Sequence, residues 1–209
     1  MRLVQKGKSP FSMRQHITSY VSSFHLTTPR LLLRPYHQEE AQVFLDLLDE
    51  NRERLLSDFP DRTSSVTNLE EAVNRIKLLE YQRRTGDLHS FGLWRQQDHQ
   101  YIGDITIRRL ARGKKVAEVG YYIDASAEGK GYISEAMLAL LEYAFEVLRM
   151  DAISLRCAKE NQRSQKVAER CGFTWTGEFV PYLNQLSDKP PRPLYTYRIT
   201  RKEYTSKAA

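Results

Sequence analysis

The chain has 209 residues, of which 41% are hydrophobic and 28% charged, a composition that excludes wholesale disorder and fits one globular domain. Lys and Arg total 32 and Asp and Glu total 26, so the net charge of +6 permits an acidic or RNA-bearing partner without requiring one. No run approaches the roughly 20 apolar residues that span a bilayer, so we expect no membrane partner.

The two cysteines, Cys157 and Cys171, form neither a metal-ligand spacing nor a disulfide framework, and we expect no metal site. Free thiols of this kind favour a reducing compartment, so the predicted location is cytoplasmic. Residues 1–25 include basic residues but no apolar stretch of signal-peptide length. We interpret 1–25 as an N-terminal extension, open to disorder or to a docking role, and 26–209 as a single domain.

The N-terminal part of the domain is predicted to hold one strand and two helices. A short apolar run closed by proline indicates a strand over 31–35. Apolar residues then recur at helical spacing over 38–56. A second helix begins at a capping box formed by Thr67 and Glu70 and ends near Gly86. The expected core face of this second helix consists of Leu69, Val73, Ile76 and Leu79.

The rest of the chain is predicted to combine strands with two further helices. Three consecutive strands, joined by short polar turns, form a meander over 88–94, 101–110 and 116–123. A long helix follows over 131–148 and a shorter one over 162–170. The remaining strands are expected over 152–158, 173–178 and 194–200. This order predicts an α/β (α+β) fold with a mixed, mostly antiparallel sheet of about seven strands and helices on both faces.

A turn with two glycines, Glu128-Gly129-Lys130-Gly131, lies between the last strand of the meander and the long helix. Glycines let the backbone approach a ligand closely, and the first N–H groups of a helix lack intrahelical partners. These donors and the positive helix end favour an anion such as a pyrophosphate, to which Lys130 can add a charge. By itself the pattern also fits an ordinary tight turn, and it matches neither a Walker loop nor a three-glycine dinucleotide fingerprint.

Several spaced motifs together make the sequence resemble the GNAT N-acetyltransferase superfamily over roughly residues 26–200. The motifs are Glu118–Ile123, similar to its central strand, Glu128–Ile133, similar to its pyrophosphate loop, and Asn161–Ser164 with Glu169–Phe173, similar to its second conserved block. Leu26–Leu31, together with Ile133–Ala136, is similar to the RimJ/RimL branch. Members of that branch acetylate protein N-termini, including those of ribosomal proteins.

The resemblance implies acetyl-CoA as cosubstrate and a splayed pair of central strands whose exposed backbone pairs with the pantetheine arm. The backbone contacts implied in this way are Tyr121, Tyr122 and Ile123. The implied pyrophosphate loop and helix start are Glu128, Gly129, Lys130, Gly131, Tyr132, Ile133 and Ser134. The usual pattern has Gln or Arg where this chain has Glu128. A carboxylate would repel a diphosphate, so we expect the Glu128 side chain to point away.

Acetyl transfer needs a base for the amine, an acid for the CoA thiolate and a donor to the thioester carbonyl, here a backbone N–H near Tyr122. Glu118 is the first candidate for the base and Tyr122 a weaker one, although Glu118 also suits a plain surface position or a cross-strand pair with a hairpin lysine. The resemblance implies that Ser164 protonates the thiolate and that Asn161 bonds the pantetheine. Either residue also suits a helix cap. Some relatives have a glutamate base near residues 180–182, where this chain has Val-Pro-Tyr, so the base stays open.

The favoured acceptor is the N-terminal amine of a protein such as a ribosomal protein. A small-molecule amine (an amino acid, an aminoglycoside or a polyamine) is the alternative, although the positive net charge disfavours polycations unless a local acidic pocket overrides it. A CoA-binding sensor without catalysis is a further alternative. A basic hairpin, either a solvated turn or a ribosomal RNA docking surface, consists of Arg108, Arg109, Arg112, Lys114 and Lys115. Acceptor specificity is expected in residues 50–68 and 180–193, and a homodimer would accord with the resemblance.

Overall fold

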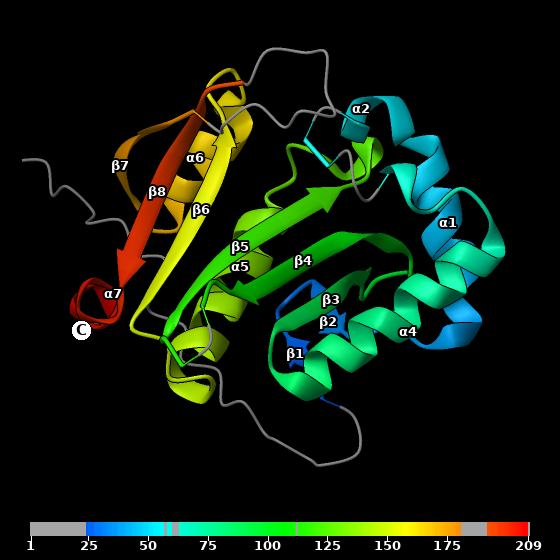
Figure 1. Cartoon of the computed structure of the whole chain (residues 1–209), viewed down its shortest axis with the longest axis horizontal. Helices are drawn as coiled ribbons and strands as arrows, with labels where there is room; N and C mark the ends of the chain where they lie inside the picture. The colour runs from blue at the N-terminus through cyan, green and yellow to red at the C-terminus, as the bar shows by residue number, and fades with distance from the viewer. Residues whose placement is uncertain (1–23, 57, 60–62, 112, 181–191, 209) are drawn as a thin grey trace, which may run out of the picture.

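An eight-stranded sheet organises the computed structural model, which describes residues 24–56, 58–59, 63–111, 113–180 and 192–208. The strands are β1 (Leu26–Thr27), β2 (Leu31–Arg34), β3 (Leu88–Arg95), β4 (Tyr101–Arg109), β5 (Val116–Ile123), β6 (Ala152–Ala158), β7 (Thr174–Phe179) and β8 (Leu194–Thr200). Their order is β1-β2-β3-β4-β5-β6-β8-β7 (Figure 1). β5 and β6 are parallel, and every other neighbouring pair is antiparallel. The predicted mixed sheet is confirmed, with the two-residue β1 added to the seven expected strands.

Helices cover both faces of the sheet, as predicted (Figure 1). They are the short 3₁₀ turn η1 (Gln38–Glu40), α1 (Ala41–Glu50), α2 (Arg52–Leu56), α4 (Leu69–Thr85), the 3₁₀ turn η2 (Ala125–Ala127), α5 (Tyr132–Glu142), α6 (Gln162–Arg170) and α7 (Arg201–Ala208). One core lies between the sheet and α5, and includes Phe91, Ile105 and Met137. A second core lies between the sheet and helices α1 and α4, and includes Phe44 and Ile76. Successive residues of a strand face opposite sides, so β3, β4 and β5 contribute to both cores.

The single helix expected over 38–56 is wrong, because η1, α1 and α2 divide that segment. Asn51 stands between α1 and α2, where its buried side-chain amide donates to the Leu47 carbonyl at 2.9 Å. The same amide nitrogen lies 2.9 Å from the Asp124 carboxylate. An asparagine side chain that bonds the backbone in this way competes with the helical hydrogen bonds and interrupts the helix.

The next helix, α4, starts one residue later than predicted. Its N-cap is Asn68, whose side chain accepts from the Glu71 N–H at 3.0 Å, and the Glu71 carboxylate accepts from the Thr67 N–H at 2.7 Å. The expected Thr67–Glu70 box is therefore wrong. The shift also turns Leu69 outward, to 47% exposure, and brings Ala72 into the core.

The long helix predicted over 131–148 is α-helical only to Glu142, and a π-helical turn, η3, follows over Tyr143–Val147. Leu148 N–H donates to the Tyr143 carbonyl at 3.0 Å, a bond five residues long. The wider turn buries three successive side chains, Tyr143, Ala144 and Phe145. The C-terminal α7 was not predicted, although Thr200 and Glu203 form a capping box at its start.

The parallel strands β5 and β6 separate halfway along their length, which confirms the splayed pair. Their pairing begins at Val116 with Ala152 and ends at Val119 with Leu155. β5 continues to Ile123 while bound to β4, and β6 continues to Ala158 while bound to β8. The strands open like a V toward α2 in Figure 1. The backbone of 120–123 therefore has one edge that no neighbouring strand covers.

Candidate active site

On the α5 and α6 face of the opening, the Tyr121 hydroxyl is buried without a hydrogen-bond partner among the described residues. Burial raises the pKa of the Tyr121 phenol, and the nearby Ser164 hydroxyl acts in the opposite direction. The phenol is therefore protonated near neutral pH and has a proton to donate. A buried donor without a partner requires an explanation, and a ligand in the opening is one. The sequence indicated only the backbone of Tyr121.

Asn161 and Ser164 lie at the start of α6, beside the opening. Asn161 is the N-cap, and its side-chain oxygen accepts from the Ser164 N–H at 3.0 Å. Its amide nitrogen donates to Asp58 at 3.2 Å, and Arg192 donates to the same carboxylate at 2.5 Å. The capping alternative is thus observed for Asn161. The Asp58 contacts join the loop after α2 to the β6–β8 side of the opening.

The glycine turn leads from the end of β5 into α5. Gly129 and Gly131 have φ of +73° and +81°, in the left-handed region that favours glycine, and Gly131 is the N-cap of α5. Within the described part of the chain, no group accepts a hydrogen bond from the backbone N–H groups of 129–134. This cluster of donors at a helix N-terminus is suited to bind an anion.

Two arginines offset the negative charge of Glu128, which precedes the turn. The Glu128 carboxylate accepts from Arg54 at 2.6 Å and from Arg163. Arg54 also donates to the Asn51 side chain at 2.7 Å and to the Ile123 carbonyl. A glutamate is tolerated beside the anion-binding turn because its charge is compensated. Local spacing gives no signal for Arg54 and Arg163, because they lie 74 and 35 residues from Glu128 in the sequence.

The residues after the turn contribute mainly backbone to the predicted site. Tyr132 and Ile133 have side chains buried in the core against the sheet. The Ser134 side chain is half-buried, and its carbonyl accepts from the Cys171 thiol at 3.7 Å. The Lys130 side chain is exposed. Of this group, Lys130 has a side chain placed to add charge near an anion.

Glu118 and Tyr122 face the other side of the sheet, toward α1 and α4. Arg156 donates to both Glu118 oxygens at 2.7 and 3.0 Å, and the Glu118 side chain is 17% exposed. Glu118 therefore forms a cross-strand pair within the paired half of β5, but with Arg156 of β6 in place of the expected hairpin lysine. The Tyr122 hydroxyl is buried and lies 2.9 Å from that of Tyr101. The structure thus groups Tyr121 with Ser164, and separates them from Glu118 and Tyr122.

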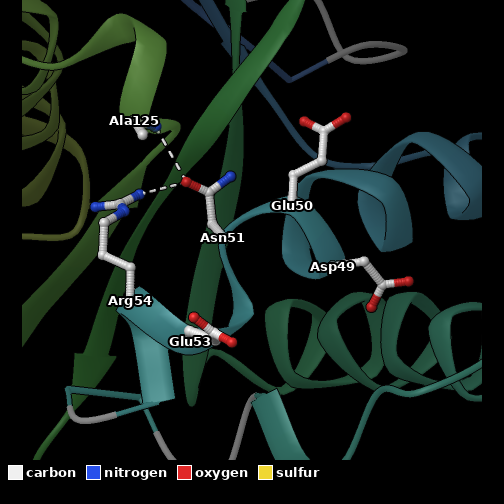
Figure 2. Close-up of a pocket in the computed structure, with 6 residues that line it drawn as sticks. All are labelled: Asp49, Glu50, Asn51, Glu53, Arg54 and Ala125. Atoms are coloured by element: carbon white, nitrogen blue, oxygen red, sulfur yellow. Dashed lines mark hydrogen bonds between the residues drawn. The ribbon is translucent and has the colours of Figure 1, made fainter.

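An open pocket of 570 Å³ lies at the carboxyl end of β5, next to the glycine turn (Figure 2). It is lined by Asp49, Glu50, Asn51, Glu53, Arg54 and Ala125. The side-chain oxygen of Asn51 accepts from the Ala125 N–H at 3.1 Å and holds the two walls together. Asp49 is paired with Arg52 and Arg54 with Glu128, so the carboxylates of Glu50 and Glu53 give the pocket its acidic character. It overlaps the region, 50–68, in which acceptor specificity is expected.

The basic hairpin is exposed where the structure describes it. Arg108 lies 3.4 Å from the Glu118 carboxylate, while Lys114 and Lys115 are exposed. Arg112, Pro181 and Tyr182 lie outside the described residues. Docking of this hairpin on RNA stays a prediction.

The described residues contain no group of three or more His, Cys, Asp or Glu side chains arranged to hold a metal ion. In the same part of the chain, no helix is both long enough and apolar enough to cross a membrane. The unpaired donors of 129–134, the uncovered backbone of 120–123 and the unpartnered Tyr121 hydroxyl fit a long ligand with an anionic group at one end. Acetyl-CoA, implied by the resemblance, has this form.

Residues 30–174 match the family described as acetyltransferase (GNAT) domain, which is well over half of the chain. The chain belongs to the GNAT family. This GNAT protein is 28% identical over 166 residues to the ribosomal protein uS5-alanine N-acetyltransferase of Escherichia coli (strain K12), covering 79% of the chain and 86% of the relative. The chain is therefore a GNAT-type N-acetyltransferase with RimJ/RimL-type relatives.

Solved structures share the fold of this GNAT enzyme. Mycobacterium smegmatis RimJ in complex with CoA-disulfide has a TM-score of 0.73 at 22% identity, covering 87% of this chain and 88% of that one. The microcin C7 self-immunity acetyltransferase MccE, in complex with acetyl-CoA and AMP, has a TM-score of 0.71 at 18% identity, covering 82% and 93%. At these sequence identities the likeness supports a common fold and does not identify the acceptor substrate.

Proposed function

We propose that this N-acetyltransferase moves the acetyl group of acetyl-CoA to the N-terminal amine of a protein, with a ribosomal protein as the favoured acceptor. The observation that supports cofactor binding is the turn of unpaired N–H donors at 129–134 beside the splayed strands. The relative named as a ribosomal protein uS5-alanine N-acetyltransferase supports a protein acceptor. Together these two observations support transfer from acetyl-CoA to a protein N-terminus.

In the proposal, each face of the sheet has its own ligand. The face with Tyr121 and Ser164 holds the cofactor, whose pyrophosphate binds at 129–134 and whose pantetheine pairs with 121–123. When bound, acetyl-CoA supplies an activated thioester. The opposite face, with Tyr122 and the acidic pocket, admits the amine. The opening between β5 and β6 is where the two ligands meet.

The chain's own groups then perform the proton transfers. The amine forms a bond to the acetyl carbon, the carbon–sulfur bond breaks, one proton leaves nitrogen and one reaches sulfur. Ser164 is proposed to supply the sulfur proton, with the Tyr121 hydroxyl as a second donor near it. Glu118 is proposed to accept the amine proton, for which Arg156 must release one of its oxygens. A backbone N–H near Tyr122 polarises the carbonyl.

A small-molecule amine is the second candidate acceptor, and the acidic pocket is the observation that favours it. Its volume of 570 Å³ is in the range of small-ligand sites. The carboxylates of Glu50 and Glu53 attract a protonated amine despite the positive net charge of the chain. A polyamine or an aminoglycoside has this chemistry.

The first experiment measures release of free CoA thiol from acetyl-CoA with peptides that copy ribosomal protein N-termini. We expect release with a free N-terminus, acetyl on the α-amine by mass spectrometry, and no release when the N-terminus is blocked and a lysine remains. Release with polyamines, aminoglycosides or amino acids but not peptides would replace the protein acceptor with a small molecule. CoA binding without any release would favour the sensor.

The same experiment includes Gly131→Asp as the control for the cofactor site. An aspartate at this position adds a negative charge to the turn and strains the backbone at a φ of +81°, so we expect no thermal stabilisation by CoA. Wild type at saturating CoA should gain about 2.7 kcal/mol at 100 times the dissociation constant, and none from ATP. An unchanged CoA affinity in Gly131→Asp would contradict the placement of the pyrophosphate.

A further inference from the structure

Arg30, which precedes β2, binds the glycine turn through its guanidinium. Its Nη1 donates to the Lys130 carbonyl at 3.0 Å, and its Nε donates to Glu135 at 2.6 Å. Glu135 lies in the first turn of α5. A Cβ at Gly131 would stand 3.6 Å from Arg30 Nη2, so the guanidinium lies directly against the turn.

We propose that Arg30 is a positioning residue for the cofactor pyrophosphate, an inference that rests on the proposed function. A trans peptide is planar, and its C=O and N–H point in opposite directions. Arg30 holds the Lys130 carbonyl, so the N–H of Gly131 is directed away from Arg30. Arg30 thereby fixes one donor of the anion-binding cluster, the Gly131 N–H, without touching the anion.

Arg30 also compensates a charge that opposes anion binding. Glu135 is 16% exposed and lies at the positive end of α5, where a bound anion would sit. Its Oε1 accepts from the Thr28 hydroxyl at 2.6 Å and from the Arg30 N–H at 2.9 Å, while Arg30 Nη2 lies 2.6 Å from Oε2. Without the guanidinium, an uncompensated carboxylate would repel the pyrophosphate.

The guanidinium has little freedom to leave this position. It lies 4.6 Å from the centre of the Tyr132 ring, over its face. Arg34, four residues along, makes the same two kinds of contact elsewhere. It pairs with Glu40 at 2.5 Å and lies 4.1 Å from the Trp94 ring. Arg34 is therefore a matched control for the loss of a guanidinium, a carboxylate pair and a ring contact.

The test compares Arg30→Met with Arg34→Met by calorimetric binding of CoA and of S-acetylpantetheine, which lacks the pyrophosphate. We expect Arg30→Met to weaken CoA binding at least tenfold, to leave S-acetylpantetheine binding within twofold, and to keep kcat at saturating acetyl-CoA. Arg34→Met should keep both affinities. Thermal unfolding without ligand checks that both variants fold.

Equal loss of affinity for both ligands, or no loss for CoA, would overturn the role of Arg30. An equal loss in Arg34→Met would also overturn it, because the effect would then follow from any broken Arg–Glu pair. Failure of the proposed function is distinguishable, because it is read in wild type: a wild type that binds CoA but transfers no acetyl group rejects the function and leaves the Arg30 comparison valid, whereas a wild type that binds neither CoA nor acetyl-CoA rejects the cofactor site itself.

Discussion

Tyr121 and Tyr122 are neighbours in sequence with opposite environments, because alternate residues of β5 face opposite sides of the sheet. The Tyr121 hydroxyl is buried without a partner beside Ser164. The Tyr122 hydroxyl lies 2.9 Å from that of Tyr101, and a hydrogen bond at 3.1 Å continues from Tyr101 to Tyr36. Removing each hydroxyl therefore has a different consequence.

Tyr121→Phe is expected to lower kcat about tenfold, the effect of losing one hydrogen bond of about 1.4 kcal/mol in the transition state. The unfolding free energy should change little, because the hydroxyl interacts within the described residues only with the Ser164 side chain nearby. Tyr122→Phe is the matched control, and should lose about 1 kcal/mol of stability with its bond to Tyr101. Chemical denaturation and steady-state kinetics measure both effects. An unchanged kcat in Tyr121→Phe would leave the hydroxyl without a part in the reaction.

The element that organises the site is β5, which is bound on both edges up to Val119 and on one edge beyond it. Its paired half contains Glu118, held by Arg156 from β6, and its open half contains 120–123. Glu118 thus connects the paired strands two residues before the opening. If Glu118 is a base, its removal lowers turnover; if it only forms an ion pair, its removal lowers stability alone.

Glu118→Gln is expected to lower kcat about 100-fold at saturating acetyl-CoA, the usual effect of losing a general base. CoA affinity should not change, because Glu118 faces away from the cofactor side. Arg156→Gln breaks the same ion pair but keeps the carboxylate, so it should match Glu118→Gln in thermal stability and retain turnover within tenfold. Similar turnover in Glu118→Gln and wild type would reduce Glu118 to the cross-strand pair.

At the scale of the whole molecule, the packing of His89 between the sheet and η3 makes the free energy of unfolding depend on pH. His89 on β3 lies with its Nδ1 3.1 Å from the Tyr143 hydroxyl of η3. Burial, followed by the charges of Arg83 and Arg109, lowers the pKa of His89 to about 4 from 6.5. The folded protein therefore keeps His89 neutral over a range in which the unfolded chain binds a proton.

Stability from His89 is complete above pH 6.5 and is lost as the pH falls toward 4, because protons then bind the unfolded state preferentially. The expected loss from this residue between pH 7 and pH 5 is about 2 kcal/mol. Urea denaturation at both pH values tests this, with His89→Asn as the variant that cannot titrate. The variant should lose about 2 kcal/mol less than wild type over that interval. Equal losses would contradict the assigned shift.

Local spacing in the sequence determined much of this protein. Apolar periodicity and turn residues predicted seven strands, each to within one residue at either end, and the boundaries of α6. The glycine turn before a helix predicted an anion site, since glycine and a helix N-terminus have these properties wherever they occur. The family motifs followed from the order of such segments along the chain.

Tertiary contacts decided the rest. Where the first helix is interrupted, Asp124, 73 residues away, accepts from the Asn51 side chain and holds it in place. The environment of the Tyr121 hydroxyl is decided by the separation of β6 from β5 and by the position of α6. The contact between Arg30 and Glu135 joins residues that are 105 apart in the sequence. Either charged side chain could instead have been exposed to solvent. Spacing along the chain defines an element, but a long polar side chain has many partners within reach. Only the packed sheet brings one of them close enough to bond.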